Sequence, residues 1–124
     1  MTDAYPEHEK TVLIRPEHLN HVGTLFGGWM MLWADDMAYN AASLAFPSAH
    51  FVTRRFEPFD FTAPAGKGDI IKVFSQVVHV GNTSCIAAVR GIKAVNGQPI
   101  FATRSVMVNV GSDGGKQSLP ITKD

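Results

Sequence analysis

The sequence lacks most of what secreted, membrane-spanning or disulfide-rich proteins require. It contains one cysteine, Cys85, so a disulfide within the chain is impossible. The N-terminal residues MTDAYPEHEK are polar and contain no apolar signal region. The most apolar run, residues 26–34, is too short to cross a bilayer. These absences predict a cytoplasmic protein with no membrane partner, because a lone cysteine is typical of a reducing compartment.

An excess of basic charge is also missing. Lysine and arginine together number 11, as do aspartate and glutamate, so the formal net charge is zero. We therefore expect no nucleic-acid partner, because such proteins normally carry a basic excess. Five histidines are present, and none is spaced from Cys85 or from a carboxylate as in a zinc site. The sequence therefore predicts no metal site.

The length and the apolar pattern predict a single domain over residues 11–110, with flexible tails at residues 1–10 and 111–124. A long helix is predicted from residue 26 to about residue 45, where Pro47 ends the pattern. The helix is largely apolar, and with a net charge of zero this favours self-association.

Strand patterns lie on both sides of the predicted helix. Their ranges are 11–15, 51–61, 70–80, 84–95 and 99–110. The dipeptides Gly81-Asn82 and Asn96-Gly97 indicate hairpins, and hence an antiparallel sheet. One helix with one antiparallel sheet is an α+β layout. We expect the sheet to curl around the helix and to bury most of its surface.

Two adjacent carboxylates, Asp35 and Asp36, stand in the middle of the predicted helix. A helix that is apolar on nearly all sides is normally buried, and carboxylates are seldom fully buried unless they are paired or functional. The two residues are about 100° apart around the helix, so only one is expected to face any given site.

Gly27 and Gly28 stand at the start of the helix, where backbone N–H groups lack partners and the helix dipole favours an anion. Asp35 follows about two helical turns later. A carbonyl whose oxygen rests on the helix start would have its carbon within reach of Asp35, directly or through a water molecule. An oxyanion donor combined with a carboxylate base or nucleophile suits acyl transfer to water.

The pattern Asn20-x-x-Gly23-x-x-Phe26-Gly27-Gly28, followed after six residues by Asp35, resembles the acyl-CoA thioesterases of the hotdog-fold superfamily. Three further segments carry the resemblance: Val52-Thr53 with Arg55 and Glu57, Asp60-Phe61 with Pro64 and Gly68-Asp69, and Gly81 with Thr83-Ser84. The similarity extends from about residue 12 to residue 110. It implies a long central helix wrapped by a curled antiparallel sheet of about five strands.

The resemblance also implies an activity and a set of site residues. The chain would hydrolyse acyl-CoA, with Asp35 as general base or nucleophile and Asn20 as the amide that orients substrate or water. Gly27 and Gly28 would supply the backbone donors to the thioester oxygen. Candidates for substrate contact are His21, Phe26, Arg55, Thr83 and Ser84. No cofactor is implied, and the coenzyme A thioester is the substrate.

Family members form dimers with active sites at the interface, so self-association as a dimer, tetramer or hexamer is expected. Coenzyme A carries phosphates, so a basic cluster is expected as well. The sequence leaves this cluster open among Arg54, Arg55, Lys67, Lys72, Arg90, Lys93 and Arg104. Trp29 and Trp33 are bulky for a helix that lines an acyl channel, and we expect them to favour short or aromatic acyl groups.

Two alternative functions follow from the same resemblance. One is a hydratase or dehydratase acting on acyl thioesters, which usually adds a histidine to the acidic residue. The predicted helix has no histidine, and Asn20 precedes it instead. The other is a non-catalytic acyl-CoA-binding domain, which would use the same fold without hydrolysis.

Overall fold

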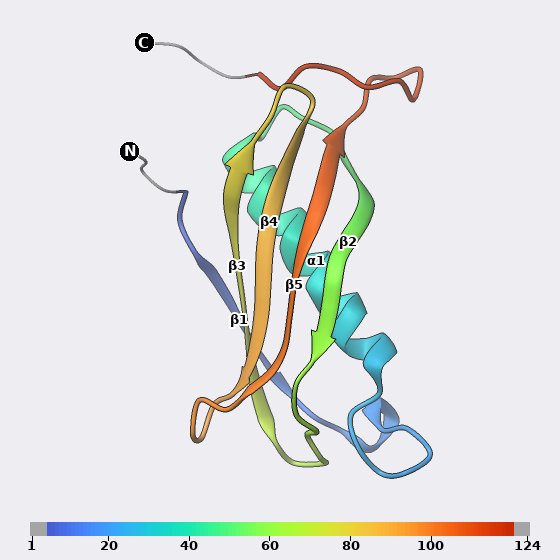
Figure 1. The fold of residues 1–124 in the computed structure, drawn as a ribbon, viewed down its shortest axis with the longest axis vertical. Helices are drawn as coiled ribbons and strands as arrows, with labels where there is room; N and C mark the ends of the chain where they lie inside the picture. Colours follow the sequence, from blue (N-terminus) through green and yellow to red (C-terminus); the bar gives the residue numbers. More distant parts are fainter. Residues whose placement is uncertain (1–4, 121–124) are drawn as a thin grey trace.

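The structure is a computed structural model that describes residues 5–120, in which one long helix packs on a five-stranded antiparallel sheet (Figure 1). The elements are β1 (His8–Leu13), η1 (Pro16–His18), α1 (Gly27–Ala45), β2 (Phe51–Phe61), β3 (Ile70–Val80), β4 (Ser84–Lys93) and β5 (Pro99–Asn109). The predicted α+β class and the helix and strand pattern are confirmed. In the described part of the chain, no helix is both long enough and apolar enough to cross a lipid bilayer.

The strand order in the sheet is β1-β3-β4-β5-β2, and all neighbouring strands are antiparallel. The hairpins β3–β4 and β4–β5 occur where the turn dipeptides predicted them. No such hairpin joins β2 to β3, the next strand in the chain, because β2 pairs with β5. Residues 62–69 therefore connect opposite parts of the sheet. β1 and β2 are the two edges, and the register of β2 shifts around Pro58, as expected for a proline in a strand.

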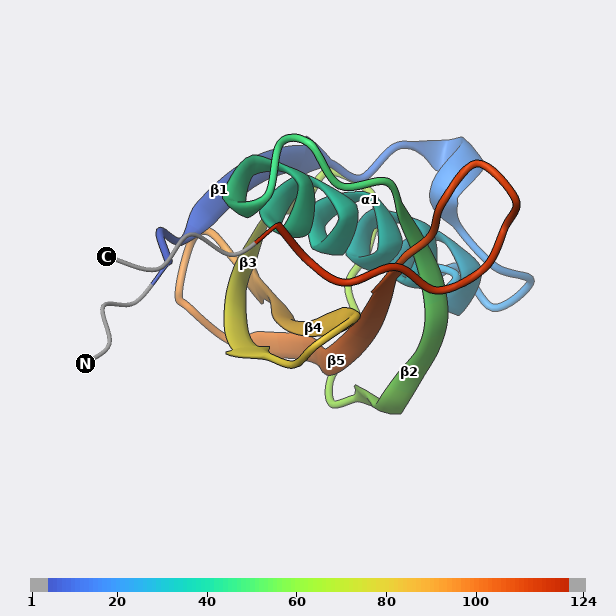
Figure 2. The same cartoon turned by 90° about the horizontal axis from the view of Figure 1, so that it is seen from above.

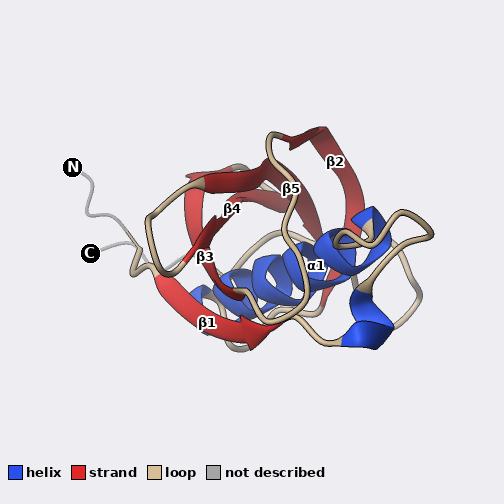
Figure 3. Cartoon of the chain, turned by 90° about the horizontal axis from the view of Figure 1, so that it is seen from below, coloured by secondary structure: helices blue, strands red, loops and turns tan. Residues whose placement is uncertain are grey.

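The sheet curves around one side of α1, as Figures 2 and 3 show along the length of the helix. The covered side of α1 carries residues at helical spacing: Met30, Trp33, Ala34, Met37, Ala38, Ala41 and Ala42. The sheet contributes alternate residues such as Ile71 and Val73 of β3, which are fully buried. These side chains form one continuous core.

The expectation that the sheet would bury most of the helix surface is wrong. Met31, Leu32, Tyr39 and Leu44 are exposed, and Leu44 keeps 63% of its surface accessible. The physical reason is that five strands curl far enough to cover one side of the helix but not the other. Single exposed apolar residues are ordinary, whereas several on the uncovered side of one helix are typical of an interaction surface.

The domain extends beyond the predicted limits of residues 11–110. Residues 8–10 belong to β1 and pair with β3, so they are not part of a tail. At the other end, Leu119 is buried, and its N–H donates a hydrogen bond to the carbonyl of Asn82 at 2.8 Å. The segment up to residue 120 therefore packs on the domain. The remaining tail residues, 1–4 and 121–124, lie outside the described residues.

Gly91 of β4 gives a direct test of the core packing. A Cβ added there would collide with the ring of Phe101, which is fully buried and stacked on Phe59 with ring centroids 5.4 Å apart. We expect Gly91→Ala to lower the free energy of unfolding by about 1–3 kcal/mol through overpacking, measured by urea denaturation. Gly66→Ala is the control, because a Cβ at Gly66 meets nothing within 4 Å. Equal stability of the two variants would contradict this packing.

Candidate active site

Asp35 lies in the middle of α1 and joins the helix to the edge strand β2. The hydroxyl of Thr53 donates a hydrogen bond to Oδ1 of Asp35, with an oxygen–oxygen distance of 2.5 Å. Asp35 is half-buried, whereas Asp36 is exposed and has no hydrogen-bond or ion-pair partner among residues 5–120. The prediction that the two carboxylates face different surroundings is confirmed.

Thr53 is a site residue that the sequence did not reveal as one. It lies 18 residues after Asp35, in a strand whose pairing is not local, so no spacing rule connects the two. Beneath it lies the buried Met107 of β5, whose sulfur is 3.5 Å from the Thr53 hydroxyl oxygen and 3.2 Å from that of Ser105. A hydroxyl has one proton to donate, and Asp35 receives it at the shorter distance. Packing on Met107 thus fixes the hydroxyl in place.

The start of α1 presents free backbone donors. The carbonyl of Phe26 accepts the N–H groups of Trp29 and Met30 at 3.0 and 3.5 Å. The N–H groups of Gly27 and Gly28 have no acceptor within the described chain. Together with the helix dipole, these two donors form a site for an anion or a polarised carbonyl oxygen.

A shallow depression of about 360 Å³ lies beside these donors. Its walls are mostly apolar and come from Leu25, Gly27, Met30, Phe61, Thr62, Ala63 and Pro64. A Cβ on Gly27 would lie 3.3 Å from the ring of Phe61, and a Cβ on Gly28 would collide with the ring of Phe26. The two glycines therefore allow two exposed phenylalanines to pack against the helix start.

Gly28 and Asp35 face the same side of the helix, because seven residues turn the chain through nearly two full turns. Their separation along the axis is about 10.5 Å at the usual rise per residue. A carbonyl bond is only ~1.23 Å long. A thioester held by the N–H groups of one helix is therefore too far for direct attack by Asp35 of the same helix.

Asn20 and His21 lie in the loop before the helix. The side-chain oxygen of Asn20 accepts the N–H groups of Val22 and Thr24 at 3.0 and 3.1 Å, and its Nδ2 donates to the Thr24 hydroxyl. Gly23 completes this turn with a φ of 85°. His21 is exposed. The structure does not bring Asn20 into hydrogen-bond contact with Asp35 of its own chain.

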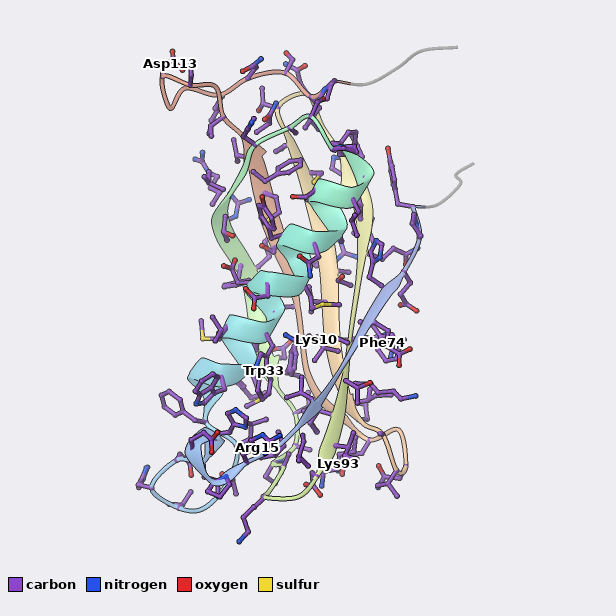
Figure 4. All side chains as sticks on the ribbon, turned by 180° about the vertical axis from the view of Figure 1, so that it is seen from behind. Lys10, Arg15, Trp33, Phe74, Lys93 and Asp113 are labelled. Carbon is purple, nitrogen blue, oxygen red and sulfur yellow. The ribbon has the colours of Figure 1, made fainter. Side chains whose placement is uncertain are left out.

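The two tryptophans pack on the other side of α1. His18 lies between them, with ring centroids 4.7 Å from Trp29 and 5.3 Å from Trp33. Trp33 belongs to the buried side of the helix and lies near the end at which the helix begins (Figure 4). Two residues along a helix correspond to about 200°, so Trp33 points away from Asp35. Neither tryptophan lines the depression at Gly27, and the expectation that they favour short or aromatic acyl groups stays a prediction.

The predicted substrate-contact residues fall into two groups. Phe26 lies at the helix start, near Gly28. Arg55, Thr83 and Ser84 line a different depression of about 310 Å³, which also includes Arg54, His79 and Lys116. Lys116 was not considered from sequence, and His79 was considered only as one of the histidines that could bind a metal ion. The structure thus separates an apolar region at the helix start from a basic region at the opposite face of the sheet.

The remaining candidate groups are the thiol of Cys85 and the side chains that could bind a metal ion. Cys85 is fully buried, and its burial raises the pKa of the thiol to about 11, so it stays protonated and unreactive at neutral pH. No cluster of three or more histidine, cysteine or acidic side chains suited to a metal ion occurs among residues 5–120.

Comparisons with known proteins show which family the chain resembles. Residues 22–100 match the family described as "Thioesterase superfamily". The chain is 33% identical over 118 residues to the acyl-CoA thioester hydrolase YciA of Salmonella typhimurium, covering 88% of this chain and 86% of that protein. It is 30% identical to acyl-coenzyme A thioesterase 11 of Mus musculus, where 90% of this chain matches only 20% of the mouse protein.

A solved structure described as an apo-hexameric acyl-CoA thioesterase superposes with a TM-score of 0.82. The sequence identity is 28%, and the match covers 92% of this chain and 75% of that chain. The fold match therefore includes nearly all of the described residues.

Proposed function

Because this chain belongs to the thioesterase superfamily, we propose that it hydrolyses acyl-CoA thioesters to a free acid and coenzyme A. The observation that carries the proposal is the half-buried Asp35, held by the Thr53 hydroxyl on the same helix face as the free N–H groups of Gly27 and Gly28. A positioned carboxylate and a preorganised oxyanion site are the two parts that thioester hydrolysis requires.

In the proposed reaction, Asp35 removes a proton from a water molecule as the water oxygen bonds to the thioester carbon. The carbonyl oxygen becomes negative and is stabilised by the N–H groups of Gly27 and Gly28 of a second copy of the chain. The carbon–sulfur bond then breaks, and the departing thiolate takes up the proton from Asp35. Direct attack by the carboxylate, followed by hydrolysis of the resulting anhydride, would use the same residues. Neither route needs a metal or redox cofactor, and that expectation stays a prediction, as does the cytoplasmic location.

We place the working site between two copies of the chain. The helix start and Asp35 of one copy are too far apart along α1 to act directly on one carbonyl group. A second copy would bring its own helix start, and Asn20 of the preceding loop, close to the first copy's Asp35. The exposed apolar side of α1 and the open edge of β2 supply the surface for this association. The hexameric relative supports self-association, with the size of the assembly left as a proposal.

The first test replaces the two neighbouring carboxylates in turn. Asp35→Asn removes the base while keeping the shape of the side chain, so we expect kcat to fall by about 10²- to 10⁴-fold. Asp36→Asn should keep kcat within about threefold, because surface changes away from the chemistry have small effects. Release of coenzyme A from a panel of acyl-CoAs, followed with a chromogenic thiol reagent, measures both variants. The reverse ranking would refute the assignment, and binding without release by the wild type would favour an acyl-CoA-binding domain.

The second test addresses Thr53 as a positioning residue. Thr53→Ala removes a hydrogen bond to a charged group, so we expect kcat to fall by about tenfold with little change in KM. Thr53→Ser keeps the hydroxyl and should restore most of the activity. If serine were no better than alanine, the packing of the threonine methyl group, and not its hydrogen bond to Asp35, would account for the loss.

A further inference from the structure

The first turn of α1 lacks the usual restraints of a helix start. It begins with two glycines, and apart from proline, glycine has the lowest helix propensity. The N-cap residue, Phe26, has no side-chain oxygen that could accept a hydrogen bond from the free N–H groups. The N–H groups of Gly27 and Gly28 are the proposed oxyanion donors, so the position of this turn matters for the reaction. A contact from outside the helix is therefore needed to hold it.

The ring of His18 makes such a contact. It packs against Trp29 in the first turn of α1 and against Trp33 one turn later, with ring centroids 4.7 and 5.3 Å away. The interplanar angles are 71° and 82°, which is the edge-to-face arrangement that aromatic rings prefer. Trp33 is buried in the core. His18 therefore connects η1 to the first two turns of the helix and, through Trp33, to the core.

A second contact fixes the orientation of the imidazole ring. The Nδ1 atom of His18 accepts the backbone N–H of Arg15 at 2.9 Å. The backbone N–H of His18 in turn donates to the carbonyl of Arg15 at 2.9 Å. This pair of bonds resembles a capping box, in which a side chain in the first turn accepts the N–H of the residue before it. The ring is thus held from two directions, by the backbone of Arg15 and by the two tryptophans.

The backbone of His18 also closes the loop that leads into the helix. Its carbonyl accepts the N–H of Phe26 at 2.8 Å, and the carbonyl of Phe26 accepts the first hydrogen bonds of the helix. Leu19 and Leu25 form a β-bridge inside the same loop, which carries Asn20. The helix begins directly after Phe26. One residue therefore restrains both the loop of Asn20 and the first turn of α1.

We propose that His18 is a positioning residue for the oxyanion site, an inference that rests on the proposed function. Its ring and its carbonyl hold the first turn of α1, so that the N–H groups of Gly27 and Gly28 are in place before a substrate arrives. Such donors stabilise the negative oxygen of the transition state because they need not reorient during the reaction. The ring packs on the tryptophans, on the side of α1 away from Asp35, and acts only through the helix start.

Three variants test this role by the release of coenzyme A from an acyl-CoA. His18→Ala removes the ring and the acceptor for Arg15, so we expect kcat to fall about tenfold through misplaced donors, with KM changed less than about threefold. His18→Phe keeps a ring between the tryptophans and should recover most of the lost kcat. Glu17→Ala is the matched control and should behave as the wild type. Glu17 belongs to the same turn, is exposed and forms no ion pair within residues 5–120.

Amide hydrogen exchange, measured by NMR, separates this inference from the proposed function. The N–H of Phe26 is bonded to the His18 carbonyl, so His18→Ala should raise its exchange rate at least about tenfold and leave that of Val73, in the sheet, unchanged. The inference is overturned if the Phe26 amide exchanges no faster, if His18→Ala keeps the wild-type kcat, or if His18→Phe is as slow as His18→Ala. If the wild type hydrolyses no acyl-CoA, the proposed function fails, and the exchange rates still decide whether His18 holds the helix start.

Discussion

The helix is apolar on most sides, but the five strands cover only one side of it. The other features of the molecule depend on this incomplete cover. Asp35 lies between the covered and the uncovered side of α1. It is buried enough to accept a hydrogen bond from Thr53 and exposed enough to contact a substrate. Gly28 and Phe26 lie on the uncovered side at the helix start. The exposed apolar residues of α1 and the free edge of β2 are then the natural place for a second copy of the chain.

Two depressions of opposite character lie on the domain. The one at the helix start is largely apolar and is bounded by Leu25, Met30 and Phe61, beside free backbone N–H groups. The other is lined by cations and lies on the outer face of the sheet. Asp35 forms no ion pair with these cations within the described residues.

Local signals in the sequence were sufficient to predict most of the fold. The helix follows from its composition and from Pro47, and two hairpins follow from Gly81-Asn82 and Asn96-Gly97. The pairing of β2 with β5 was not predictable, because no local turn connects them. The burial of Leu119 was not predictable either, because a single apolar residue in a polar tail forms no periodic pattern. For the site, Asp35 stood out as a charge in an apolar helix, whereas the contact of Thr53 with Asp35 crosses the fold and leaves no local pattern in the sequence.

In the proposed site, Asp35 of one copy acts together with the helix start of another, and a mixed dimer provides the sharpest experiment. Asp35→Asn and Gly28→Val chains, each with a different tag, are co-expressed, and the heterodimer is purified through both tags. Each parent homodimer should be inactive, whereas the heterodimer should keep about half of the wild-type kcat, because one of its two equivalent sites combines two intact halves. A heterodimer as inactive as its parents would show that each site lies within one chain and that no site is shared between two copies.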